Sequence, residues 1–356
     1  MNSNHSQEEI QKPEIRQNVN LAPYNTLQIE AIADRFVVIR HAGELPVLFK
    51  NKEFPIEDAW VLGSGSNVLF RGRVRPLVLK NEIKGLEILE EDDRRIRIRS
   101  GAGMNWHQLV EYCVNKKWQG VENLALIPGT VGAAPIQNIG AYGVELEEVF
   151  ESLQAFDLHK GTFRRFEKEA CEFDYRDSVF KQRYKNRFVI TSVDLRLNKA
   201  SYMLETGYPS LREWFDRHNL SSPGLEDIFR AVVNIRTAKL PDPRDIGNAG
   251  SFFKNPIISR VKFDEIKQDY PSIHSYPLTE NRIKVPAGWL IEKTGWKGKR
   301  KGNVGTYENQ ALVIVNHGGA TGEEIWELAQ QIRSSVQKTF GIELVPEVNI
   351  VGEARG

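Results

Sequence analysis

The chain has few cysteines, almost no net charge and no long hydrophobic run, and each absence excludes a class of protein. Its two cysteines, Cys113 and Cys171, form neither a metal-binding spacing nor a disulfide framework, as expected in a reducing cytoplasm. A net charge of +1 argues against bulk electrostatic binding to nucleic acid or to an anionic membrane. No apolar stretch approaches the roughly 18 residues that a membrane span requires. With 40% apolar and 27% charged residues, the composition is that of a soluble globular protein.

The common catalytic constellations are also missing from the sequence. The seven histidines are scattered, and no Ser/His/Asp set, Cys/His pair or metal cluster has a recognisable spacing. No internal repeat is present, and the length favours two or three domains at roughly 100–200 residues each. The first 18 residues are polar and contain no hydrophobic segment, so they do not form a secretory signal. We therefore expect a disordered tail over residues 1–19.

One stretch is unusual against this background: residues 127–143 contain four glycines and three alanines. Glycine permits backbone angles that are closed to other residues, and it lets the main chain approach a ligand closely. A run so poor in bulky side chains cannot form a normal core strand or a stable isolated helix. The stretch is typical of a surface that fits a flat or phosphorylated ligand. A loop of small residues between two elements is the plain alternative.

A second glycine-rich segment, residues 63–67, directly follows a strand predicted over residues 59–62. A strand that ends in a Gly/Ser turn presents several backbone N–H groups at one point, which suits a pyrophosphate. The segment is not the dinucleotide-binding fingerprint, because Val68 occupies the third glycine position and no helical pattern follows. A tight turn without a ligand explains it equally well.

Hydrophobic periodicity and capping signals predict a mixture of helices and strands. Thr321 and Glu324 form a capping box, and Gly341 ends the helix that they begin. Ser222 followed by Pro223 is typical of a helix start. We expect helices over residues 105–116 and 321–341, and a third that starts near 222 and ends within 236–243. The strands expected are 36–39, 59–62, 150–156, 188–197, 311–315 and 344–351, with a hairpin over 86–100.

Three polar features interrupt the local pattern. Arg176 and Asp177 lie in an aromatic segment, Ser251 lies in a glycine loop, and Glu347 lies in an apolar strand. Each has a structural explanation. The first two can be a surface ion pair worth under about 1 kcal/mol. Ser251 can bond its own turn, and Glu347 can face solvent from an edge strand. From the residues alone, these structural explanations are favoured.

Taken together and in order, these patches resemble the UDP-N-acetylenolpyruvoylglucosamine reductases, a family of flavoenzymes that make UDP-N-acetylmuramate for peptidoglycan. Each segment is modestly specific, but the ordered set is highly specific and covers most of residues 20–351. The spacing, with Tyr208 between the arginine and serine segments, is similar to the subtype with a substrate-covering tyrosine loop. The matching segments are 25–27, 63–67, 127–143, 175–178, 250–256, 287–291 and 346–347.

The resemblance implies an α+β fold. It consists of a two-lobed FAD-binding domain of the vanillyl-alcohol-oxidase (PCMH) type and a C-terminal α+β substrate-binding domain. We expect the first lobe over residues 20–80, the second over 81–215 and the substrate-binding domain over 216–342. A C-terminal strand, 343–356, would return to the active site. The family implies a cytoplasmic monomer without a metal ion and without a nucleic-acid or membrane partner.

The resemblance also implies the reaction. NADPH would reduce non-covalent FAD, and a hydride would then pass to the enol ether of UDP-N-acetylglucosamine enolpyruvate. Arg176 and Glu347 would stabilise the enediolate, and Ser251 would protonate the neighbouring carbon. Glu347 can do so only if it is protonated or orients other donors, and Ser251 needs a site that favours its alkoxide or relays a proton.

The remaining site residues follow from the same resemblance. Tyr208, Lys239, Asn255 and Gln310 would hold the UDP-sugar. Tyr307 departs from the pattern, because some relatives have a histidine there. FAD would lie against the small residues and free N–H groups of two stretches: Gly63, Ser64, Gly65, Ser66, Asn67, and Pro128, Gly129, Thr130, Gly132, Ala133, Gln137, Asn138, Gly140, Ala141, Tyr142.

Two other functions share parts of this pattern. A flavin oxidase acting on an alcohol or sugar would have the flavin lobes, but it has no need of the loop 250–256 together with Pro346 and Glu347. A non-catalytic protein that binds a flavin or nucleotide sugar would lose nothing on replacement of Ser251.

Overall fold

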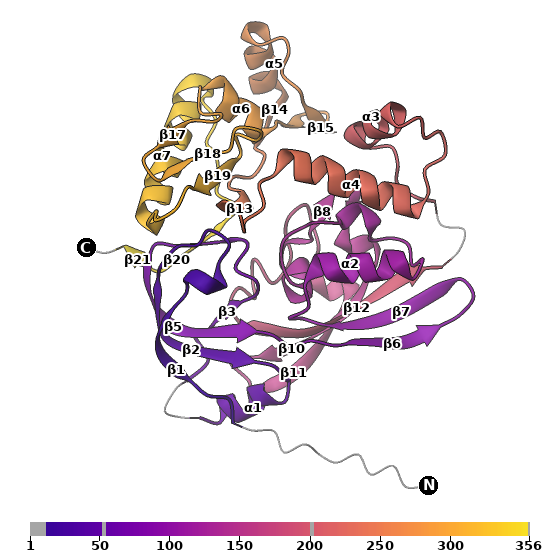
Figure 1. Cartoon of the computed structure of the whole chain (residues 1–356), viewed down its shortest axis with the longest axis vertical. Helices are drawn as coiled ribbons and strands as arrows, with labels where there is room; N and C mark the ends of the chain where they lie inside the picture. The colour runs from indigo at the N-terminus through magenta and orange to yellow at the C-terminus, as the bar shows by residue number, and fades with distance from the viewer. Residues whose placement is uncertain (1–11, 52–54, 200–202, 355–356) are drawn as a thin grey trace. The chain divides into compact units, whose positions relative to one another are not determined.

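The computed structural model describes residues 12–51, 55–199 and 203–354, and the chain forms two compact units (Figure 1). The first unit comprises Met1–Val19, Ala33–Ser64 and Arg75–Val233, and the second comprises Asn20–Ile32, Gly65–Val74 and Asn234–Gly356. Strand β5 (Gly72–Asn81) and helix α4 (Leu225–Lys239) have residues in both units. Helices and strands occur in each unit, so the α+β prediction is confirmed. The expected division into two lobes and a substrate domain stays a prediction.

Two sheets form the framework of the first unit. In one of them β3 (Trp60–Leu62) runs parallel to β5, and β1 (Arg16–Asn20) pairs with β2 (Ile32–Ile39). The other is antiparallel and has the order β11-β10-β12-β7-β6, which lie side by side in Figure 1. Its strands are β6 (Leu86–Glu91), β7 (Arg95–Gly101), β10 (Phe150–Asp157), β11 (Thr162–Glu167) and β12 (Phe188–Asn198).

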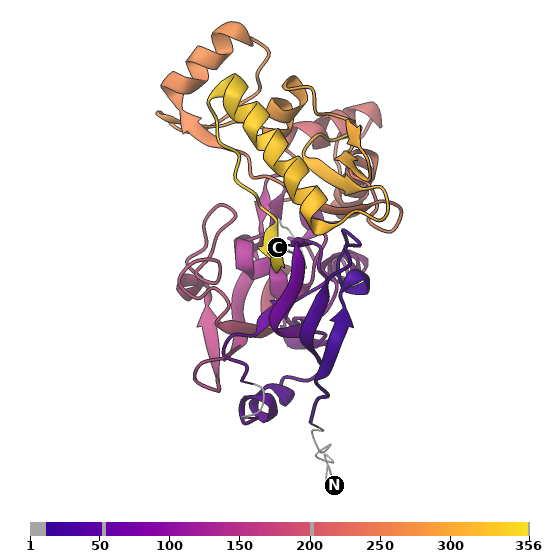
Figure 2. The same ribbon diagram turned by 90° about the vertical axis from the view of Figure 1, so that its left-hand side faces the viewer.

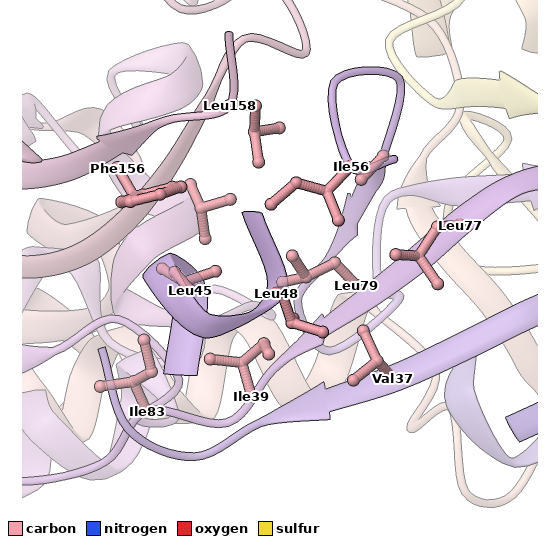
Figure 3. Close-up of a cluster of buried hydrophobic side chains, with 12 residues drawn as sticks. Val37, Ile39, Leu45, Leu48, Ile56, Leu77, Leu79, Ile83, Phe156 and Leu158 are labelled. Carbon is pink, nitrogen blue, oxygen red and sulfur yellow. The ribbon is translucent and has the colours of Figure 1, made fainter. Parts of the chain in front are cut away.

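A buried cluster joins these two sheets (Figure 3). Val37 and Ile39 of β2 are two residues apart, so they point to the same face of their strand, and Leu77 and Leu79 of β5 do the same. Phe156 of β10 packs into the cluster from the second sheet. Helix α1 (Glu44–Phe49) covers it with two leucines. Burial of these apolar side chains is the main stabilising term of the unit.

Short elements above this framework carry the glycine-rich stretch. Asn105 caps α2 (Trp106–Asn115) as predicted, since its side chain accepts the N–H of Gln108 at 3.0 Å. Residues of the glycine-rich stretch then form a 3-10 helix rather than an α-helix. The other elements of the unit are the 3-10 helices Glu122–Leu124, Val131–Gln137, Leu146–Glu148 and Lys168–Cys171, the strands β8 (Gly140–Ala141) and β9 (Val144–Glu145), and α3 (Pro209–Arg217).

The second unit contains a four-stranded antiparallel sheet in the order β13-β19-β18-β17. Helix α7 (Gly322–Phe340), yellow in both views, lies against this sheet (Figures 1 and 2). A parallel pair, β4 (Val68–Phe70) and β20 (Asn349–Val351), brings the C-terminal segment back to the residues that follow the Gly/Ser turn. The other elements are the 3-10 helix Ala22–Tyr24, β13 (Gly247–Ser251), β14 (Ile257–Ser259), α5 (Arg260–Asp269), β15 (Tyr276–Thr279), β16 (Arg282–Lys284), α6 (Ala287–Lys293), β17 (Arg300–Lys301), β18 (Val304–Thr306), β19 (Val313–Asn316) and β21 (Glu353–Ala354).

Three sequence predictions need correction. The tail expected over residues 1–19 is wrong at its end, because β1 pairs with β2, while residues 1–11 lie outside the described residues. Helix α4 begins at Leu225 rather than directly after Ser222 as its N-cap, because the Asp227 carboxylate accepts the N–H of Gly224 at 3.0 Å and so caps the helix there. The C-terminal strand expected over 344–351 pairs with β4 only over 349–351, because residues 345–347 pair instead with the segment around Phe253.

Candidate functional site

Arg176 lies on a loop of the first unit in a left-handed backbone conformation, with φ at +55°. This conformation is uncommon for a residue with a side chain. Its guanidinium donates from Nη1 to the carbonyl oxygen of Asn138 at 3.2 Å and to Glu145 Oε1 at 3.3 Å. Nη2 donates to the carbonyl oxygen of Gly140. The predicted catalytic arginine is therefore bound to the end of the glycine-rich stretch.

Gly140 has to be glycine for this arrangement. A Cβ at this position would lie 2.7 Å from Arg176 Nη1 and 2.9 Å from Glu145 Cγ. Neither distance is compatible with a real side chain. The structure shows that Gly140 accommodates the arginine, and its predicted contact with FAD stays a prediction.

The middle of the glycine-rich stretch alternates between buried and accessible residues. Thr130, Val131 and Ala134 are buried, whereas Gly129 and Ala133 are accessible. The stretch therefore presents small residues outward from a packed support, and this fits the face of a flat ring system. The number of backbone N–H groups available to a ligand is smaller than predicted.

The prediction of free N–H groups is wrong at three consecutive residues of this stretch, the first being Val131 and the last Ala133, whose N–H donates to Thr130 O at 3.0 Å. The N–H of Val131 donates to Met104 O at 2.9 Å, and the N–H of Gly132 donates to Ala102 O at 2.8 Å. A Cβ on Gly132 would also lie 2.5 Å from that of Ala102. Gly132 therefore serves packing, and its contact with FAD stays a prediction.

Gly63 brings the Gly/Ser turn against the glycine-rich stretch within the first unit. A Cβ on Gly63 would lie 2.8 Å from Thr130 Oγ1, so only glycine permits the approach. The structure thus joins the beginnings of both predicted FAD-binding stretches. Gly65, in the second unit, has φ at +69°, and its missing Cβ would lie 2.0 Å from the carbonyl oxygen of Tyr24.

Tyr208 precedes α3 and packs against the end of the glycine-rich stretch. Its ring centroid lies 5.3 Å from that of Tyr142, edge to face. The buried Asn123 connects the same two segments, because its Nδ2 donates to Tyr142 O and to Glu205 O, each at 3.0 Å. The segment that carries the predicted substrate-covering tyrosine is therefore attached to the predicted flavin surface.

Ser251 and Glu347 come together in the second unit through their backbones. Ser251 is the last residue of β13, and the N–H of Glu347 donates to the carbonyl oxygen of the next residue, Phe252, at 2.9 Å. Lys254 N–H donates to Val345 O at 2.9 Å on the same pair of segments. Both predicted catalytic side chains are half-buried.

Two predicted substrate ligands in this unit contact the start of α6. Asn255 Oδ1 accepts the N–H of Ala287 at 2.9 Å. Gln310 Oε1 lies 2.8 Å from the position of a Cβ on Gly288, which explains that glycine. Lys239 is exposed at the end of α4, and the N–H of Tyr307 donates to Val313 O at 2.8 Å. The structure shows the lysine and the tyrosine in no common contact among the described residues.

Sequence reasoning missed Glu145 and Asn123 altogether. Glu145 contacts Arg176 from 31 residues away, and Asn123 contacts Glu205 from 82 residues away. No local pattern indicates such contacts.

The two cysteines are buried. Burial raises the pKa of both thiols, Cys113 and Cys171, to about 12, so neither is a reactive nucleophile. Among the helices of the described residues, none combines the length and the apolar composition that crossing a membrane requires.

Two protein-family models match this chain. The model of an FAD binding domain matches residues 52–167. The model of the UDP-N-acetylenolpyruvoylglucosamine reductase C-terminal domain matches residues 242–351.

Full-length relatives match as well. Proteins named UDP-N-acetylenolpyruvoylglucosamine reductase from Flavobacterium johnsoniae and Amoebophilus asiaticus are 42% and 46% identical over 338 residues, 95% of this chain. The alignments cover 100% and 99% of those two proteins. The crystal structure of the reductase from Thermus caldophilus has a TM-score of 0.65 at 23% identity, covering 96% of this chain and 99% of that one. That structure supports the fold, and the sequence relatives support the family.

Proposed function

This chain belongs to the UDP-N-acetylenolpyruvoylglucosamine reductase family, and we propose that it reduces UDP-N-acetylglucosamine enolpyruvate to UDP-N-acetylmuramate for peptidoglycan synthesis. FAD is its cofactor and NADPH its reductant. The observation that carries this function is the backbone pairing that joins the Ser251 and Glu347 segments. A plain flavin oxidase has no need of that pairing.

The two glycine-rich stretches hold FAD. Gly129 and Ala133 offer an accessible surface without bulk, and the contact between Gly63 and Thr130 supports the two stretches against each other. Bound FAD supplies the hydride for the enol ether after reduction by NADPH. The protein residues supply binding, orientation and proton transfer.

Arg176 binds the carboxylate of the enolpyruvyl group. A guanidinium fork binds a carboxylate through two parallel hydrogen bonds. Because negative charge on that carboxylate increases in the transition state, the guanidinium stabilises the transition state. Its partly buried position strengthens this interaction relative to water.

Ser251 delivers a proton from Oγ to the carbon next to the one that receives the hydride. Glu347 acts from the adjoining segment, either as a neutral acid that donates a hydrogen bond or by orienting other donors. An ionised Glu347 facing the enediolate would raise the barrier, because like charges repel.

Tyr208, Lys239, Asn255 and Gln310 bind the UDP-sugar. Because Asn255 Oδ1 already accepts the N–H of Ala287, its Nδ2 group is the part that can donate to substrate. The lysine is suited to the diphosphate as an exposed cation at a helix end. A cytoplasmic location, a monomeric state and the division into lobes belong to the same proposal.

Anaerobic absorbance spectroscopy tests this function. The purified protein should be yellow, bleach on addition of NADPH, and regain its colour only when UDP-N-acetylglucosamine enolpyruvate is added. Ser251→Ala should bleach normally and fail to regain colour, whereas Ser272→Ala, an exposed serine of the same unit, should behave as the wild type. Recovery with oxygen alone would support an oxidase, and a protein unable to take up FAD would overturn the proposal.

A further inference from the structure

We propose that Glu145, fixed by Asn138, is a positioning residue that holds the Arg176 guanidinium in the orientation needed to bind the substrate carboxylate. This inference rests on the proposed function of Arg176. It assigns a role to an acidic residue that neither the sequence pattern nor the family resemblance indicated.

The contacts of Arg176 occupy one part of its guanidinium. A guanidinium has five N–H donors. Nη1 uses two of them, toward Asn138 O and Glu145 Oε1, and Nη2 uses one, toward Gly140 O. Within the described part of the chain, Nε–H and one Nη2–H have no hydrogen-bond acceptor. Those two remaining donors can form the fork that a carboxylate accepts.

Glu145 is the only charged member of this set of acceptors, and it is itself held in place. Its carboxylate accepts from Asn138 Nδ2 at 2.9 Å through Oε2, while Oε1 accepts from the arginine. The two oxygens thus face different partners, which fixes the plane of the carboxylate. Glu145 also caps the short 3-10 helix Leu146–Glu148 in a reciprocal capping box with Glu148.

Asn138 gives this arrangement its rigid base. Its side chain is fully buried, and its Oδ1 accepts the N–H of Glu147 at 3.0 Å. Its backbone is left-handed, with φ at +41°, and this orientation directs its carbonyl oxygen toward Arg176. A strained residue held by several contacts is common at functional sites, where it preorganises another group.

The physical consequence is orientation rather than added charge. A carboxylate beside the guanidinium lowers the positive potential that a substrate carboxylate meets, so charge alone would favour its removal. Without Glu145, however, one Nη1 donor loses its acceptor and the planar group can turn about its side-chain bonds. Misplacing a binding group by about 1 Å costs on the order of 100-fold in rate.

The test measures the two half-reactions separately in stopped flow. Glu145→Ala should reduce FAD with NADPH at the wild-type rate and slow reoxidation by the enol ether on the order of 10- to 100-fold. Glu145→Gln keeps an oxygen acceptor for Nη1, so its rate of reoxidation should fall by less than about 10-fold. Glu111→Gln is the control, because it removes one negative charge from an exposed position on α2 in the same unit. A crystal structure of Glu145→Ala should show the guanidinium turned from its wild-type orientation.

Arg176→Ala in the same assay separates the two levels of inference. If Arg176→Ala abolishes reoxidation and Glu145→Ala leaves it unchanged, the positioning role is overturned and the proposed function stands. If Arg176→Ala itself has no effect on reoxidation, the role proposed for the arginine is overturned. Equal losses of reoxidation rate for Glu145→Gln and Glu145→Ala would contradict orientation through an oxygen acceptor.

Discussion

The backbone N–H of Glu347 donates to the carbonyl oxygen of Phe252 at 2.9 Å, one residue beyond Ser251. The same C-terminal segment is fixed from another direction, because Asn349 N–H donates to Asn67 O at 3.1 Å and Asn67 Nδ2 donates to Glu347 O at 3.4 Å. Main-chain bonds therefore hold the segment that carries the Glu347 side chain. A change in that side chain should affect activity without disturbing the segment.

Glu347→Gln should keep more activity than Glu347→Ala. A glutamine amide is neutral and donates a hydrogen bond, as the protonated acid does, so it can still stabilise negative charge on the substrate. Alanine removes the donor, and loss of one such donor typically costs on the order of 100-fold in kcat. Reoxidation of the reduced enzyme by the enol ether measures the effect. Equal activity of the alanine variant and the wild type would remove Glu347 from the mechanism.

Asn123→Ala should weaken substrate binding through the Tyr208 segment. The buried amide of Asn123 donates to both Tyr142 O and Glu205 O, so its loss releases the Glu205 segment and leaves two acceptors without this donor. We expect KM for the UDP-sugar to rise by about 10-fold, equivalent to about 1.4 kcal/mol, while KM for NADPH changes little. Asn115→Ala, an exposed asparagine of the same unit, is the control. An increase in both KM values would indicate general damage to the unit instead.

Local signals predicted the elements, and distant contacts determined the site. Helix α7 begins with the predicted reciprocal bonds of Thr321 and Glu324 and ends at Gly341, whose φ is +68°, because both signals lie within a few residues of the boundary. The start of α4 was wrong by two residues, because the helix begins at Leu225 rather than directly after Ser222, with the Asp227 carboxylate bonded to the N–H of Gly224. Propensity identified the helix, but it could not choose between two neighbouring polar groups.

The candidate site shows the same limit more clearly. Arg176, Ser251 and Glu347 stood out as polar residues in unsuitable surroundings, and the family resemblance gave them roles. The support of Arg176 could not be predicted, because its acceptors lie 31 to 38 residues earlier and two of them are main-chain carbonyls. Carbonyl groups are present at every residue, so the sequence contains no mark of which ones are used.

Gly65→Ala should destabilise the protein far more than Gly302→Ala. Both glycines have positive φ, +69° and +61°, which costs a side-chain residue about 1–2 kcal/mol. A Cβ at residue 65 would lie 2.0 Å from Tyr24 O, whereas nothing lies within 4 Å at residue 302. We expect Gly65→Ala to lower the free energy of unfolding by more than about 4 kcal/mol, a range associated with severe backbone or packing conflicts. Denaturant unfolding of the FAD-free proteins measures it and keeps cofactor loss out of the comparison. Similar decreases in the free energy of unfolding for both variants would show that the loop around Tyr24 moves to accommodate the new side chain.

The capping box of α7 should give the protein a stability that acid removes. The backbone N–H of Thr321 donates to Glu324 Oε2 at 2.7 Å and its hydroxyl donates to the same atom at 2.9 Å. These two bonds hold the pKa of Glu324 below its ordinary value of 4.5. Because the folded state favours the ionised form, the contribution is complete above pH 4.5 and is lost as the pH falls through the lowered pKa.

Glu324→Gln isolates this effect, since glutamine can form the capping box but carries no charge. At pH 7 we expect a lower Tm for Glu324→Gln than for the wild type, and the difference should shrink as the pH falls below 4.5. Glu327→Gln, an exposed change on the next turn of the same helix, controls for the loss of one negative charge. Thermal unfolding followed by far-ultraviolet circular dichroism at several pH values measures both. A Tm difference between Glu324→Gln and the wild type that stays constant from pH 7 to acid would contradict the ionic contribution. A pH-independent difference cannot come from a group that titrates in this range.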